Sequence, residues 1–239
     1  MAMSKLLKSE SVHDEGKTRR FNKIRPSCDR FFTSRNFFGA QINHETETGM
    51  MSCRVPEDNS LLTSIYFILS DGLILNGETL EIRKMIAEEV TNNPERYTTA
   101  FLGMPAEDFC QWVMIANHGQ GALELAILSE HLQIEIIVID CFTLAATHYG
   151  ESENYTDRFF LIYDAGHYDP LLYEQNDIWW TIFPASDEAF LQMALEAAQK
   201  AKINLTLYCP VCNALLHGNK AARAHVMATG HKEFEELAV

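Results

Sequence analysis

The 239-residue sequence contains no apolar run long enough to cross a membrane. A spanning helix needs about 20 mostly apolar residues, and the segment from Met1 to Ser9 also lacks the apolar core of a signal peptide. We therefore expect a soluble, cytoplasmic protein with no membrane partner. The 47% apolar and 22% charged residues are ordinary for a globular chain and exclude wholesale disorder.

Closely spaced cysteines are also scarce. Of the 6 cysteines, only Cys209 and Cys212 lie near each other in the sequence. The other four are scattered, at Cys28, Cys53, Cys110 and Cys141. This usage suits a reducing compartment and a metal site better than a framework of disulfides.

A basic surface is the third missing feature. Residues 1–54 hold 10 Lys+Arg and 6 Asp+Glu, giving +4, whereas residues 55–239 hold 9 and 27, giving −18; the sum is the net charge of −14. Because phosphates attract a basic surface, the acidic body argues against nucleic acid as a partner. The charge favours a basic protein partner, with solubility alone as the plainer explanation.

The order of helical and strand patterns predicts an α/β (α+β layered) body. Helical spacing of apolar residues follows Ser60, and further helices are expected at 78–90, 106–116, 121–132 and 187–202. Runs of β-branched and aromatic residues predict strands at 134–140, 159–163 and 179–183. We expect three parts: a loosely ordered segment at 1–50, a layered domain at 51–203 and a small C-terminal unit at 204–239.

The C-terminal segment carries the strongest local motif. Its spacing is C-x2-C-x12-H-x5-H, formed by Cys209, Cys212, His225 and His231. Zinc is held by four such ligands in a tetrahedron, and this spacing supplies a knuckle and a helix that present them. We therefore predict a structural zinc in a ββα-type finger, against the alternative of a chance grouping. A single finger in an acidic surround is a poor DNA reader.

Two segments are candidates for a catalytic site. In the first, Val55–Ser64, a turn leads into a helix whose first N–H groups could stabilise an oxyanion. The second, Tyr163–Pro170, leaves a strand and carries His167 and Asp169. If this stretch is extended, both side chains project to one side, and the carboxylate fixes the histidine tautomer. The plainer explanations are a helix cap and a structural histidine.

Together these segments resemble the OTU deubiquitinases, specifically the YOD-type branch that ends in a two-Cys two-His finger. That branch has a loop of the form P-x-D-N-S-C-L-F, a helix with G-G-x-x-E-x-x-x-L-S, and a loop of the form I-Y-D-x-x-H-Y-D-P-L. The corresponding segments here are Pro56–Ser60, Gly121–Ser129 and Ile162–Leu171. The resemblance covers about residues 52–239, in the same order.

The resemblance implies a papain-like OTU cysteine-protease fold and hydrolysis of isopeptide bonds in ubiquitin and polyubiquitin chains, with no metal in the reaction. It assigns Asp58 to shaping the oxyanion hole, His167 to the general base and Asp169 to orienting His167. Gly166 is expected to line the channel for the ubiquitin tail. The same branch carries an N-terminal ubiquitin-like domain that docks an AAA unfoldase, for which residues 1–50 are too short and irregular.

The family's nucleophile is missing. Where the motif continues with Cys-Leu-Phe-Thr-Ser, Ser60 is followed directly by Leu61, Leu62 and Thr63. Ser60 is adjacent, but a serine does not ionise as readily as a cysteine. A substitute cysteine would have to lie within hydrogen-bond reach of the base, and the positions of Cys53, Cys110 and Cys141 in the sequence do not favour this. Three explanations stay open: a ubiquitin-binding pseudoenzyme, a cysteine lost from the sequence through modification or a gene-model error, or an unrecognised nucleophile.

Overall fold

A computed structural model places most of the chain after residue 48. It describes residues 32–33, 41–42, 49–56, 59–70, 72, 79–115, 121–164, 166–176, 178–204 and 206–237. The segment 1–50, expected to be loosely ordered, lies almost entirely outside these ranges, as does Asp58. Among the helices described, none combines the length and the apolar character that a membrane crossing requires.

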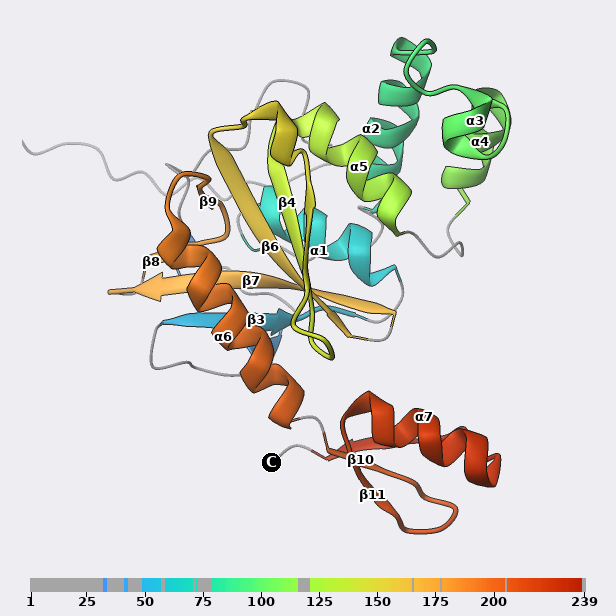
Figure 1. The fold of residues 1–239 in the computed structure, drawn as a ribbon, viewed down its shortest axis with the longest axis vertical. Helices are drawn as coiled ribbons and strands as arrows, with labels where there is room; N and C mark the ends of the chain where they lie inside the picture. Colours follow the sequence, from blue (N-terminus) through green and yellow to red (C-terminus); the bar gives the residue numbers. More distant parts are fainter. Residues whose placement is uncertain are drawn as a thin grey trace, which may run out of the picture.

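Within the described residues, a nine-stranded sheet forms the centre of the body (Figure 1). Its continuous path runs β1-β8-β7-β6-β4-β5, with β3 paired to β7, β2 to β3 and β9 to β6. Only the β4–β6 pair among these is parallel. The bounds are β1 Phe32–Thr33, β2 Gln41–Ile42, β3 Met50–Arg54, β4 Glu135–Asp140, β5 Ala146–Tyr149, β6 Asp157–Asp164, β7 His167–Gln175, β8 Ile178–Trp180 and β9 Phe183–Pro184.

Helices cover both faces of the sheet. The bounds are α1 Ser60–Leu69, α2 Thr79–Asn92, α3 Thr99–Leu102, α4 Ala106–Val113, α5 Ala122–Leu132 and α6 Glu188–Asn204. Helices α1, α2 and α5 share the larger buried cluster with residues such as Ile136 and Leu161. Helix α6 packs on the opposite face, over Ile137 and Phe160 (Figure 1). Because neighbours along a strand alternate between faces, β4 and β6 supply both cores.

Helix α1 is the most deeply placed helix of the body. Its residues are buried apart from Thr63, so the helix is apolar all round rather than on one stripe. It lies between the sheet and the helical layer, in the larger cluster. The chain therefore holds the start of α1 in a fixed position relative to β7, with which α1 makes direct hydrogen bonds.

Several expected elements are present with small shifts at their ends. Helices expected at 78–90, 121–132 and 187–202 correspond to α2, α5 and α6, and the strands expected at 134–140 and 159–163 to β4 and β6. The single strand expected at 179–183 is wrong. The chain instead forms β8 and β9, which pair with different strands, β7 and β6, because it turns at Thr181 and Ile182 between them.

The sequence patterns missed β3, β5 and β7. Strand β7 contains Pro170, which cannot donate to a ladder, so its sequence resembles a loop. Strand β3 has no clear alternation and is buried at four of its five positions. Both strands form because they pair with each other, with Met51 opposite Leu172. The two residues lie far apart in the sequence, so a local pattern cannot predict this pairing.

The C-terminal finger is a small three-stranded sheet with one helix. Its elements are β10 Thr206–Tyr208, β11 Leu215–His217, α7 Gly218–Thr229 and β12 Glu235–Leu237, and β10 lies between the other two strands. The ββα arrangement is as expected, with β12 added after it. The division of the chain at residue 203 stays a prediction.

Candidate functional site

The histidine and aspartate singled out in the sequence lie together at the start of β7. His167 Nε2 is 2.9 Å from Asp169 Oδ1, the contact that their i, i+2 spacing predicts. Their side chains are 12% and 9% exposed, so water competes little for the contact. An ionised carboxylate only accepts, so Nε2 carries the proton, and Nδ1 is the ring nitrogen left with a lone pair to act as a base.

The Asp169 carboxylate is held from two further directions. Oδ1 also accepts from the Val55 backbone N–H at 3.1 Å, and Oδ2 accepts from Arg54 Nη1 at 3.2 Å. Both donors come from the chain at the end of β3, which runs beside β7. Three hydrogen bonds fix the carboxylate in one orientation, and the fixed carboxylate orients the His167 ring.

The first turn of α1 is fastened to the same strand. Ser60 Oγ accepts from the Tyr168 backbone N–H at 3.1 Å, and Ser64 Oγ donates to the Tyr168 carbonyl at 2.8 Å. The two serines stand at i and i+4, so they share one helix face. Tyr168 lies between His167 and Asp169 in the chain, and the start of α1 is therefore beside the dyad, as the site prediction requires.

Asn59 precedes α1 in a left-handed conformation, with φ 59° and ψ 36°, which asparagine tolerates better than most residues. Its side chain does not cap the helix, contrary to the plainer explanation of this turn. Instead Oδ1 accepts from Arg83 Nη2 at 2.6 Å, while Arg83 Nη1 donates to the Val113 carbonyl at 2.6 Å. Arg83 is 1% exposed, and it ties α2, α4 and the turn before α1 together.

Sequence reasoning missed Arg54, Ser64 and Arg83. For Ser64 a signal exists, because two serines at i and i+4 in an otherwise apolar helix call for partners on one face. For Arg83 no clear signal exists, because two adjacent cations, Arg83 and Lys84, lie between the buried Ile82 and Met85 of α2 and only Arg83 turns inward. The partner of Arg54 follows only from the pairing of β3 with β7, which no local pattern reports.

The cysteines of the body are poorly suited to attack. Cys53 is completely buried, and burial, with a smaller effect of the nearby Asp169 carboxylate, raises the pKa of its thiol to about 12. Cys110 contacts the Ala87 carbonyl at 3.6 Å, between α2 and α4. Cys141 is buried at the end of β4. Cys53 and Cys141 are buried and Cys110 is only half-exposed, whereas a reactive cysteine needs an accessible sulfur. Cys28 lies outside the described residues.

The two remaining predicted site residues are Asp58 and Gly166, and the structure describes only Gly166. Asp58 lies outside the described residues, so its role stays a prediction. Gly166 directly precedes β7 with φ +114°, a conformation that side chains rarely adopt. A Cβ built there would meet nothing within 4 Å, so the backbone next to His167 is open to an approaching chain.

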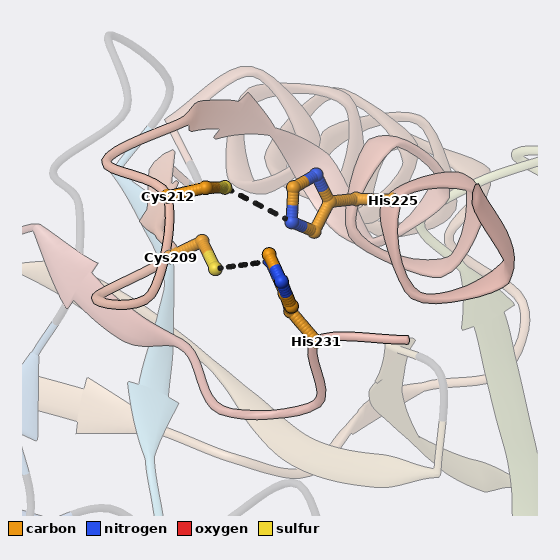
Figure 2. Close-up of side chains that lie close together, drawn as sticks. All are labelled: Cys209, Cys212, His225 and His231. Carbon is orange, nitrogen blue, oxygen red and sulfur yellow. Dashed lines mark hydrogen bonds between the residues drawn. The ribbon is translucent and has the colours of Figure 1, made fainter. Parts of the chain in front are cut away.

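The four predicted metal ligands converge in the finger (Figure 2). Their ligand atoms all lie within 4.8 Å of one another. Cys212 Sγ is 3.4 Å from His225 Nε2, and Cys209 Sγ is 3.6 Å from His231 Nδ1. A tetrahedral zinc with ordinary bond lengths places sulfur and nitrogen ligands about 3.6 Å apart. The arrangement therefore fits zinc.

The backbone of the knuckle also favours a thiolate. The pKa of the Cys209 thiol lies below its ordinary value. Desolvation acts to raise it, but backbone N–H groups of Cys212 and Val211 and the Cys212 side chain hydrogen-bond to the sulfur and outweigh that effect. A deprotonated sulfur is the form that binds a metal.

Comparison with solved structures defines the fold of the body. An ovarian tumor (OTU) domain solved in complex with ubiquitin matches with a TM-score of 0.54 at 24% identity, over 63% of this chain and 85% of that chain. The layered sheet and helices described above are thus an OTU fold, and the C-terminal unit is an added finger.

Comparison with known sequences is more specific. Residues 204–237 match the family described as the C-terminal C2H2-type zinc finger of ubiquitin thioesterase OTU1. Ubiquitin thioesterase OTU1 of Homo sapiens is 36% identical over 228 residues, which is 90% of this chain and 65% of the relative, and that of Gallus gallus is 39% identical over 195 residues, 77% and 65%. The chain is thus similar in sequence to the OTU1-type ubiquitin thioesterases at 36–39% identity. It spans less than two thirds of the length of these relatives.

Proposed function

We propose that this chain is a ubiquitin-binding protein of the OTU deubiquitinase lineage whose thiol chemistry is absent in the sequence as it stands. The observation that carries the proposal is the His167–Asp169 pair beside the start of α1, kept at 2.9 Å although no cysteine follows Ser60. Support for the ligand comes from relatives named ubiquitin thioesterase OTU1 and from an OTU domain solved with ubiquitin.

The chemistry of the lineage maps onto the retained residues. In an active site of this type, His167 Nδ1 takes the proton of a thiol, and the thiolate attacks the isopeptide carbonyl at the end of the ubiquitin tail. The C–N bond then breaks, and the imidazolium of His167 gives its proton to the leaving lysine amine, which leaves a thioester. Asp169 keeps the ring oriented and stabilises its charged form. The N–H groups at the start of α1 stabilise the oxyanion, with Asp58 shaping the hole. Water then releases ubiquitin from the thioester. Without a thiol, binding is the function that remains.

The acidic body suits this ligand, because it favours a basic segment such as a tail that carries arginine. The open backbone at Gly166 supports passage of the tail's terminal glycines beside His167. In the finger, we propose a structural zinc held by Cys209, Cys212, His225 and His231. It serves protein binding or caps the C-terminal end of the body, because a single finger on a −14 chain is a poor nucleic-acid reader.

Titration calorimetry with ubiquitin tests the proposal. We expect binding by the unmodified chain without cleavage of ubiquitin dimers, and a loss of about tenfold in affinity for Gly166→Ala, equivalent to about 1.4 kcal/mol. The matched control is Gly103→Ala, which also has a positive φ, +76°, and no atom within 4 Å of a built Cβ. Because Gly103 ends α3, away from the dyad in the sequence, its variant reports the effect of a positive-φ substitution on folding alone. Absence of ubiquitin binding, or equal losses in both variants, contradicts the proposed mode.

A further inference from the structure

The position that faces β7 on the first turn of α1 belongs to Ser60. Residues of β7 near Tyr168 pair with β6 on one side, Tyr163 opposite Tyr168. On the other side, β3 pairs with β7 only as far as Leu171. The Tyr168 N–H and carbonyl are bonded by Ser60 and Ser64 instead, at 3.1 and 2.8 Å. Helix α1 therefore takes the place of a neighbouring strand beside the dyad.

The register of α1 is fixed by its packing. Leu61 and Leu62 are 2% and 0% exposed and belong to the larger buried cluster together with Ile65. Rotating or sliding the helix by one residue would move these side chains off their neighbours and would break both serine bonds to Tyr168. Leu61 consequently points into the core, and Ser60 is the first-turn residue whose side chain is directed at the strand that begins with His167.

We propose that Ser60 occupies the place of the nucleophile, with a hydroxyl where the related enzymes have a thiol. In the motif C-L-F-T-S the cysteine stands four residues before the last serine, and Ser60 stands four residues before Ser64. The missing residue therefore falls before α1 in the sequence, and the helix position itself is kept. This inference rests on the proposed function, and it identifies Ser60 as the residue whose hydroxyl replaces the reactive thiol.

The hydroxyl explains why the site binds without attacking. A helix N-terminus and a nearby histidine can convert a thiol to a thiolate, but a serine at the same place stays protonated unless a base takes its proton in the reaction. Ser60 Oγ accepts a hydrogen bond from the Tyr168 backbone N–H, with 3.1 Å between N and Oγ, and Ser60 is 4% exposed. This contact places the Ser60 side chain next to the backbone of the residue that follows His167.

The experiment compares two single cysteines. Ser60→Cys and Leu61→Cys are treated with ubiquitin bearing a C-terminal propargyl group, which a thiolate adds to, and the products are weighed by mass spectrometry. We expect Ser60→Cys to be labelled, and the unmodified chain and Leu61→Cys not to be labelled. Adding His167→Ala to Ser60→Cys should slow labelling by about a hundredfold or more, the usual contribution of a positioned base. Equal labelling of both cysteines, or labelling of Leu61→Cys alone, overturns the proposal.

A second readout does not depend on ubiquitin. Alkylation by iodoacetamide, located by peptide mapping, is followed against pH. For Ser60→Cys we expect a midpoint below the ordinary thiol value of about 8.5, and a rise of that midpoint when His167→Ala is added. A midpoint that His167→Ala leaves unchanged overturns the proposal even if ubiquitin binds. Failure of the unmodified chain to bind ubiquitin, with the His167-dependent midpoint present, counts against the proposed function and supports the place of Ser60.

Discussion

The finger and the α1–β7 site both assemble polar side chains at one point, but over very different distances along the chain. The cysteine–histidine contacts of the finger span at most 22 residues. The contact between Ser60 and Tyr168 spans 108. A short motif shows all of its members at once, so the finger could be recognised as complete from its spacing. At the α1–β7 site, the register of the buried helix α1 determines which residue lies opposite Tyr168, and no local motif reports that register.

The largest expected effect separates the finger from the body. Cys212→Ser removes one of four zinc ligands, and zinc binding contributes about 10–16 kcal/mol to folding in small fingers. We expect elemental analysis to fall from one zinc per chain to none and the finger to become protease-sensitive, while residues 55–200 keep their fold. Cys110→Ser, whose thiol contacts Ala87 and Thr91 between α2 and α4, should keep its zinc. A freshly purified, chelator-free protein with no zinc contradicts the assignment.

The second effect restores chemistry in the body and leaves the finger alone. Inserting one cysteine between Ser60 and Leu61 places a thiol four residues before Ser64 and returns the turn to its family length. We expect cleavage of ubiquitin dimers to rise about a million-fold over the unmodified chain, the scale of a lost nucleophile. His167→Ala in the same background should abolish the gain. If the unmodified chain already cleaves and His167→Ala stops it, another residue is the nucleophile.

A third change should destabilise the body without affecting zinc. Arg83→Met removes the donors to the Val113 carbonyl and to Asn59 Oδ1. Leaving a neutral buried acceptor without its donor costs about 1–3 kcal/mol, so we expect a clear fall in the denaturation midpoint with zinc content unchanged. Arg96→Met is the control, because Arg96 is 54% exposed and its ion pair with Glu130 should contribute about 1 kcal/mol or less. Equal falls in the denaturation midpoint for the two variants would contradict a specific stabilising role of Arg83.

The smallest expected effect depends on pH. Burial raises the pKa of Glu124, although the Gly121 N–H and the Arg83 charge oppose the shift. A raised folded pKa means that stability is full below the unfolded value of about 4.3 and declines as pH rises through the folded value. In Glu124→Gln, the amide oxygen can still accept from the Gly121 N–H. The amide does not ionise, so this variant should not show the decline in stability. Urea titrations from pH 4 to 7 should therefore show the variant gaining relative to the parent, and a constant difference contradicts the assignment.

The predictable parts were those that a local pattern encodes. The β4 run, the α5 helix and the four zinc ligands need no knowledge of distant residues, and the His167–Asp169 contact follows from alternation along an extended chain. The missed parts depend on partners far away in sequence. Asn59 resembles a helix cap, but Arg83 of another helix binds its side chain. His167–Gln175 contains a proline and becomes a strand because β3 and β6 lie on either side of it.

The pairing of β3 with β7 also sets a waiting time during synthesis. About 120 residues separate Met51 from Leu172, and ribosomes add roughly 5–20 residues per second, so β3 emerges about 6–24 seconds before its partner exists. During that interval the apolar α1 segment has neither the sheet nor Tyr168 to bind. We therefore expect the nascent chain to expose the apolar surface of α1 until β7 leaves the ribosome. The finger is built from neighbouring residues and has no comparable delay before its four ligands can meet.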